Sequence, residues 1–80
     1  MTLQERLKTA FAAGLGLPDT TDFASLEYRK IPEWDSVAHM QLVMEIENAF
    51  DIMLPTEDVL GLSSFAIATQ IVSRHAGADA

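Results

Sequence analysis

The chain of 80 residues contains no cysteine, so it offers neither a disulfide framework nor a thiolate metal site. Basic residues are also scarce: five Lys or Arg stand against twelve Asp or Glu, and the formal net charge is −7. A chain this acidic repels the phosphates of nucleic acids and anionic membranes, and it favours partners with basic patches. Binding to DNA or RNA is therefore not expected, and any thiol that the protein uses has to come from another molecule.

Long apolar runs are missing as well. No segment approaches the ~20 apolar residues that a membrane span needs. The charges of Glu5, Arg6 and Lys8 interrupt the apolar pattern at the N-terminus, which argues against a signal peptide. Hydrophobic residues make up 49% of the chain and charged residues 21%, as in folded globular proteins. We therefore expect one small cytoplasmic domain with no membrane span and no room for a deep enzyme cleft.

The first half of the chain predicts two helices joined by a long loop. Thr2 and Glu5 have the spacing of a capping box before an amphipathic helix, which Gly14 and Gly16 are expected to end. The following stretch to about residue 34 contains two prolines and has no sustained hydrophobic period, so it is expected to be a long loop that a few apolar side chains, Leu26, Tyr28 and Ile31, pin to the domain. Loops longer than about 12 to 15 residues are uncommon in compact domains and are often functional. A second helix is expected from residue 36 to about 50.

The second half predicts two more helices. Thr56 is placed to cap a short third helix, and Ser63 or Ser64 to cap a fourth, which a glycine at position 77 would end. The predicted fold is an all-α four-helix bundle with three longer helices, one short third helix and a long loop between the first two. Its domain spans 1–76, and 77–80 form a disordered C-terminal tail.

The second helix carries two apolar stripes on a helical wheel. One is a continuous face that has to join the core. The other consists of Val37, Met40 and Met44, with Glu47 on one side and Gln41, Asn48 and Glu45 on the other. It either packs beneath a neighbouring segment or meets partner proteins, for which the adaptable Met side chain is suited. The core face consists of Leu42, Val43, Ile46, Ala49 and Phe50.

Asp35 and Ser36 stand at the start of this helix and allow two interpretations. Either residue can be a plain helix cap, worth about 1 kcal/mol. Alternatively, a phosphate ester on the Ser36 oxygen would be stabilised there, because unpaired N–H groups and the helix dipole favour negative charge at a helix N-terminus. The two residues by themselves favour the cap.

The segment WDSVAHMQLVMEIENAFDIMLP, residues 34–55, resembles the acyl carrier proteins, which are small four-helix carriers. Asp35, Ser36 and Val37 correspond to the Asp-Ser-Leu signature of that family. The downstream pattern of aliphatic residues, an acid, an aromatic residue and a proline is matched as well, and the likeness in helix order covers essentially the whole chain. The matching downstream residues are Leu42, Val43, Ile46, Glu47, Phe50 and Pro55.

The resemblance implies that a magnesium-dependent transferase moves 4′-phosphopantetheine from coenzyme A onto Ser36, with help from Asp35. The arm supplies the thiol that holds an acyl group as a thioester. The carrier itself is not an enzyme, holds no metal and is expected to be a monomer. Its partners are acyl-loading and acyl-processing enzymes with basic docking patches. The residues expected to meet them are Val37, Met40, Gln41, Met44, Glu45, Glu47 and Leu54, with Asp51, Glu57 and Asp58 behind them.

Other functions remain open at this point. A carrier of aminoacyl or peptidyl groups shares the same fold, arm and serine, and an unmodified helical interaction module would keep only the fold. Two departures from the family point to a specialised carrier within fatty-acid, polyketide or related biosynthesis. One is Val37, where the family usually has Leu, and the other is the lower density of acidic residues along the second helix. His39 stands three residues after Ser36, but a histidine that fills the space beneath Trp34 is favoured over a catalytic pair, because neither an orienting acid nor an oxyanion hole is evident.

Overall fold

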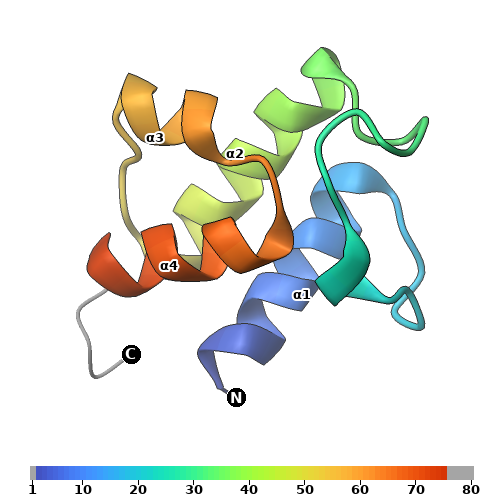
Figure 1. Cartoon of the computed structure of the whole chain (residues 1–80). Helices are drawn as coiled ribbons and strands as arrows, with labels where there is room; N and C mark the ends of the chain where they lie inside the picture. The colour runs from blue at the N-terminus through green and yellow to red at the C-terminus, as the bar shows by residue number, and fades with distance from the viewer. Residues whose placement is uncertain (1, 76–80) are drawn as a thin grey trace.

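The computed structural model describes residues 2–75 and contains four α-helices and no β-strand within them (Figure 1). The expected all-α fold is confirmed, with three longer helices and a short third one. The expected tail at 77–80, the glycine stop at 77 and the domain boundary at residue 76 lie outside the described residues. No described helix is long and apolar enough to span a membrane. The helices are α1 (Leu3–Leu15), α2 (Ser36–Phe50), α3 (Thr56–Gly61) and α4 (Phe65–His75).

Helix α1 begins at the predicted capping box. The Thr2 hydroxyl accepts a hydrogen bond from the Glu5 N–H, and the Thr2 N–H donates to the Glu5 carboxylate, each at 3.1 Å. These bonds hold the pKa of the Glu5 carboxyl below its ordinary value. Gly16 ends the helix in the left-handed region, with φ 67°. Gly14 does not end it, contrary to the sequence prediction, because it is needed inside α1 for a close contact with α2.

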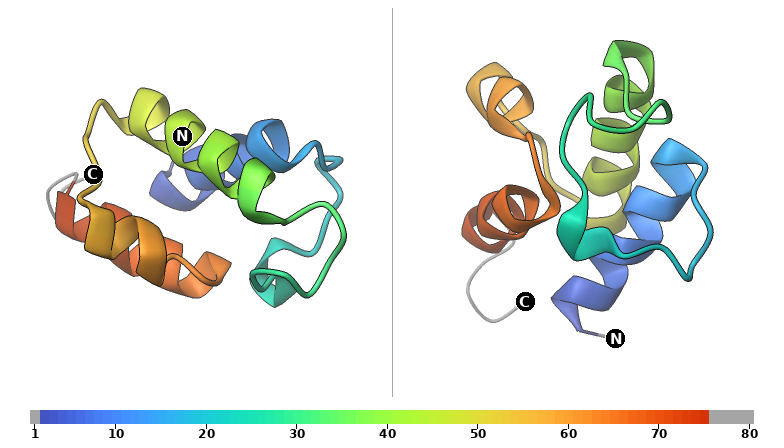
Figure 2. Two further views of the ribbon diagram at one scale, coloured as in Figure 1. Left: turned by 90° about the horizontal axis from the view of Figure 1, so that it is seen from above. Right: turned by 45° about the vertical axis from the view of Figure 1, so that its right-hand side comes forward.

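That contact joins the two longest helices, which cross side by side in both views of Figure 2. A Cβ atom added to Gly14 would lie 2.6 Å from the Leu42 Cα atom of α2. Arg6 of α1 adds a polar link, because its guanidinium donates to the Ala49 carbonyl and lies 4.5 Å from the centre of the Phe50 ring. Helix α2 is therefore fixed along most of its length against α1.

The long connection between α1 and α2 is pinned to the core by apolar side chains, as expected, and it contains local structure that the sequence did not predict. It contains a 3-10 turn, η1 (Phe23–Ser25), and it buries Phe23 and Leu26 in the core. A short β-bridge pairs Glu27 with Ser64, just before α4. The loop is thus attached to the rest of the domain well before it reaches α2.

Trp34 completes this attachment. Its side chain is fully buried, and its ring meets the edge of Phe11 at 5.5 Å between ring centres. Phe11 in turn meets Phe65 of α4 at 5.1 Å, so three segments share one aromatic cluster. Trp34 thus seats the loop on the helices, and the loop delivers Asp35 and Ser36 to a fixed position.

The second half of the chain differs from prediction at one cap. Ser64 caps α4 as expected, since its hydroxyl accepts from the Ile67 N–H at 3.1 Å. Thr56, by contrast, is the first residue of α3 and not its cap, because Pro55 occupies the capping position and makes no side-chain cap bond. Helix α3 buries none of its side chains fully. Its Val59 packs partly buried against the core, and its polar contacts are described below.

Candidate functional site

The structure separates the roles of Asp35 and Ser36. Asp35 has extended backbone angles and caps α2: its Oδ1 atom accepts a hydrogen bond from the Ala38 N–H at 2.8 Å. Ser36 is the first helical residue and is exposed. Its hydroxyl makes no hydrogen bond to any residue between 2 and 75. The cap therefore belongs to Asp35, and the Ser36 hydroxyl has no hydrogen-bond partner among the described residues.

The position of this hydroxyl suits an anionic group. The first N–H groups of a helix have no acceptor within the helix, and the Asp35 side chain takes up only that of Ala38. A negative charge near a helix N-terminus is typically favoured by about 0.3–1 kcal/mol at an exposed position. A phosphodiester on Ser36 would thus be stabilised without being buried.

The second stripe of α2 faces solvent. Val37 is 74% exposed, Met40 53% and Met44 54%, and the neighbouring Gln41 is exposed too. The interpretation that this stripe packs beneath another segment is therefore wrong. These four residues, which we call the α2 stripe, begin directly after Ser36 and form a partly apolar surface along the helix.

The expected acidic and apolar contacts around the stripe need three corrections. Leu54 is only 9% exposed and belongs to the core, so its side chain is not part of the surface. The Oε2 atom of Glu47 accepts from the Leu54 N–H at 2.9 Å, so this acid holds the turn after α2. Asp58 bonds to His75 at 2.6 Å and lies 3.4 Å from Arg74. Glu45 is partly exposed, and Asp51 and Glu57 are exposed.

The structure also shows exposed apolar side chains that the sequence did not single out. They are Met53, in the turn after α2, and Leu60, on α3. Helix α3 has only six residues, which is too short for a hydrophobic period to show which side faces out. Met53 lies in an irregular turn, for which periodicity gives no prediction at all.

His39 forms a buried hydrogen-bond chain. Its ring lies nearly parallel to the Trp34 indole, with 20° between the planes and 6.1 Å between the ring centres. Its Nδ1 atom accepts from the Trp34 Nε1–H at 2.9 Å, and its Nε2–H donates to the Val59 carbonyl of α3 at 2.8 Å. Both ring nitrogens are thus engaged, and neither one contacts Ser36. The preferred interpretation of His39, as filling the space beneath Trp34, is confirmed.

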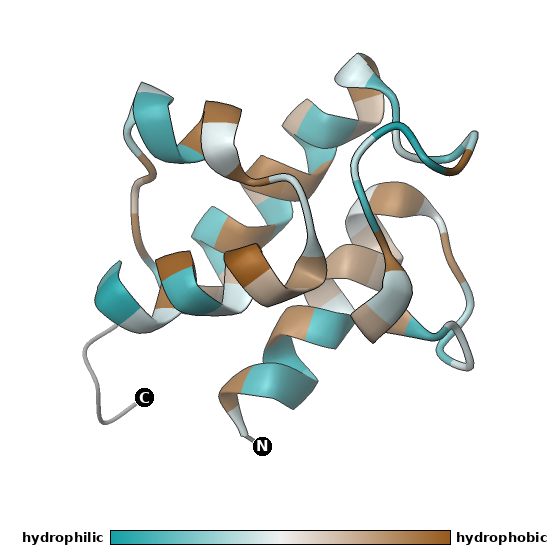
Figure 3. Ribbon diagram, viewed as in Figure 1, coloured by the Kyte–Doolittle hydropathy of each residue, from teal (hydrophilic) through white to brown (hydrophobic). Residues whose placement is uncertain are grey.

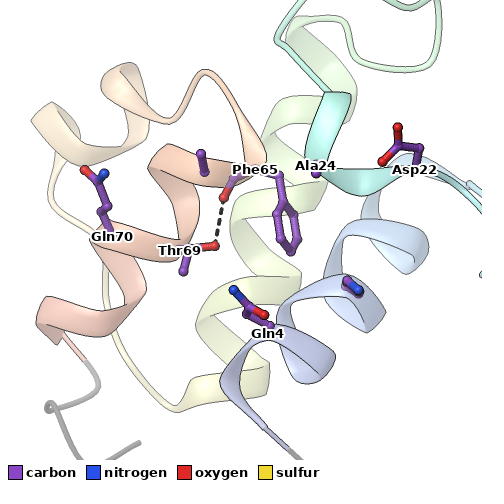
Figure 4. A pocket seen from close by; sticks show the side chains of 8 residues that line it. Gln4, Asp22, Ala24, Phe65, Thr69 and Gln70 are labelled. Carbon is purple, nitrogen blue, oxygen red and sulfur yellow. Dashed lines mark hydrogen bonds between the residues drawn. The ribbon is translucent and has the colours of Figure 1, made fainter.

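A hollow of about 470 Å³ lies between α1, η1 and α4 (Figure 4). The ring of Phe65 points down from α4 toward α1 and forms its wall, while Gln4 and Thr69 lie beside it. The Thr69 hydroxyl is already bonded to the Phe65 carbonyl at 3.0 Å. Neither Ser36 nor a histidine lines this hollow, so it is separate from the site at the start of α2.

Over residues 2–75, no group of three or more His, Asp or Glu side chains is placed to hold a metal ion. The features that stand together are thus Ser36, its neighbour Asp35 and the α2 stripe. In comparisons with known proteins, no protein-family model, no curated protein and no solved structure matches this chain significantly.

Proposed function

We propose that this chain is a stand-alone carrier protein of the acyl carrier type, a four-helix bundle that works in the cytoplasm. It holds an acyl group as a thioester on a 4′-phosphopantetheine arm attached to Ser36. The observation that carries this proposal is the exposed Ser36 hydroxyl, which makes no hydrogen bond within residues 2–75 although it stands at a helix start. Its neighbour Asp35 already provides the cap, so capping does not explain the serine.

The surroundings of Ser36 support the same function. A carrier has to meet several enzymes in turn and leave each of them, which favours a small and adaptable contact surface. The α2 stripe offers two Met side chains beside the attachment point, on a chain with a net charge of −7. Contacts between this acidic chain and basic patches would be weak and sensitive to salt.

Loading of the arm tests the proposal directly. The protein is incubated with coenzyme A, magnesium and a broad-specificity phosphopantetheinyl transferase, and its mass is then measured. We expect the wild type to gain one phosphopantetheine and Ser36→Ala to gain none. Ser25→Ala is the matched control, because Ser25 is also exposed but lies in η1, and it should load fully.

Two outcomes of that assay would contradict the proposal. An unchanged wild-type mass would favour the alternative function, an unmodified helical interaction module. An equal gain in Ser36→Ala would place the modification on another residue. Once the arm is attached, loading with an acyl or an aminoacyl group would distinguish an acyl carrier from an aminoacyl or peptidyl carrier.

Variants of Asp35 separate its two roles. Asp35→Ala should lower the free energy of unfolding by about 1 kcal/mol, because the hydrogen bond to the Ala38 N–H is lost. Asp35→Asn keeps an acceptor oxygen and should change stability by only a few tenths of a kcal/mol. Both variants lack the carboxylate, so we expect both to load more slowly than the wild type. If Asp35→Asn loads as fast as the wild type, Asp35 acts only as the helix cap and has no role in loading.

A further inference from the structure

Some basic residues of this acidic chain contact an acid or another helix, and others do not. Arg6 is engaged with α2, and Arg74 lies 3.4 Å from Asp58. Arg29 and Lys30 are adjacent in the loop before α2, and both are exposed. Neither forms an ion pair with an acid between residues 2 and 75. Lys8 of α1 also has no ion pair within residues 2–75, but it is not adjacent to another cation, so Arg29 and Lys30 are distinguished by being two unpaired neighbours.

The loop folds so that this pair lies at the Ser36 end of α2. The Arg29 N–H donates to the Trp34 carbonyl at 3.1 Å, and the Trp34 N–H donates to the Ile31 carbonyl at 3.2 Å. Arg29 adopts a φ of 65°, which is unfavourable for a residue with a side chain and persists only where its surroundings enforce it. These turns return the chain to Trp34, two residues before Ser36. Figure 3 shows the hydrophilic colour of this stretch between η1 and α2.

A hollow of about 280 Å³ opens at this turn. Its volume lies just below the range of about 300–1,000 Å³ that is usual for sites of whole small molecules, which leaves room for a single anionic group at the surface. The Asp35 carboxylate also lines it and opposes an anion, but two cations against one acid leave a net positive charge. The lining residues are Arg29, Lys30, Ile31, Pro32, Trp34 and Asp35.

We infer that Arg29 and Lys30 form a binding site for a phosphate group beside Ser36. A guanidinium matches two phosphate oxygens with parallel N–H bonds, and a lysine adds a compact charge. The site rests on the proposed function, since that function brings phosphate to this place in two forms. One is the phosphodiester of the attached arm, and the other is a phosphate of the incoming coenzyme A. The two cations would bind the negatively charged phosphate oxygens that both forms share.

The test compares Arg29→Gln/Lys30→Gln with Lys8→Gln, which removes an exposed cation of α1 that does not line this hollow. Phosphorus NMR of the loaded protein follows the arm, and loading kinetics follow the donor. If the attached arm is the occupant, high salt should displace its phosphodiester from the two cations and shift the phosphorus resonance of the wild type and of Lys8→Gln. The double variant should show no such shift. If coenzyme A is the occupant, its KM should instead rise about two- to fivefold for each cation removed.

Titration of the unloaded protein with inorganic phosphate, followed by amide NMR, tests the site independently of loading. The amides of 29–35 should shift in the wild type and in Lys8→Gln but not in the double variant. A wild type that refuses the arm but shows these shifts would refute the carrier function and keep the phosphate site. Normal loading without any phosphate response would overturn the site. A rise only in the KM for the carrier would also overturn it, since that result assigns the pair to protein docking.

Discussion

Replacing Gly14 with alanine is expected to lower the free energy of unfolding by about 2–3 kcal/mol. The new Cβ atom would lie 2.6 Å from the Cα atom and 3.0 Å from the backbone N atom of Leu42. Backbone atoms cannot rotate away as a side chain can, so α1 and α2 would have to separate. The better helix propensity of alanine, worth about 1 kcal/mol, offsets only part of the cost. Urea unfolding followed by circular dichroism measures the change.

Gly61→Ala is the matched control for this experiment. It makes the same chemical change at a helical position where no atom lies within 4 Å of the added carbon. We expect it to leave stability unchanged or to raise it slightly, because alanine restricts the unfolded chain. If Gly14→Ala were as stable as Gly61→Ala, the close contact between α1 and α2 would be wrong. The total free energy of unfolding of an 80-residue domain is roughly 4–12 kcal/mol, so the expected loss is a large part of it.

Replacing His39 with alanine is expected to lower the free energy of unfolding by about 3 kcal/mol. The substitution leaves the Trp34 indole N–H and the Val59 carbonyl without their partner. Each unsatisfied buried group costs about 1–3 kcal/mol, and the lost ring adds a cavity beside Trp34. The loss should also release α3, so amide hydrogen exchange at 56–61 should accelerate more than exchange in α1.

Two further variants make this prediction specific. Trp34→Phe, combined with His39→Ala in a double-mutant cycle, should show a coupling of about 0.5–3 kcal/mol, because the two side chains share one hydrogen bond. His75→Ala removes the other described histidine, whose bond to Asp58 is at the surface, and should cost no more than about 1 kcal/mol. Equal effects of His39→Ala and His75→Ala would contradict a structural role for the buried chain.

The helices could be predicted from sequence because their signals are local. The capping box at Thr2, the stop at Gly16 and the cap at Ser64 are each fixed by residues three or four positions apart. Gly14 was wrongly predicted to end α1, because the need for glycine there is not local. Glycine is required by the close approach of Leu42, which belongs to another helix. The bridge of the long loop was missed for the same reason, since it pairs Glu27 with a residue far along the chain.

The candidate site was predicted in part. Helical spacing separated the α2 stripe from the core face correctly, but it could not show which stripe neighbours were already engaged. Glu47 and Asp58 look like free surface acids in the sequence, and only the folded chain brings Leu54 and His75 to them. Arg29 and Lys30 gave no pattern at all, because their place beside Asp35 depends on the turns that precede Trp34.

Helix α3 buries no side chain fully: Val59 is partly buried against the core, and polar contacts join His39 to the Val59 carbonyl and Asp58 to His75 of α4. Helices α1 and α2, by contrast, meet at the close backbone distance that Gly14 permits. Segments with few buried apolar contacts open at a lower free energy than the core of a domain. Local opening should therefore begin at α3, while the paired helices α1 and α2 keep their places.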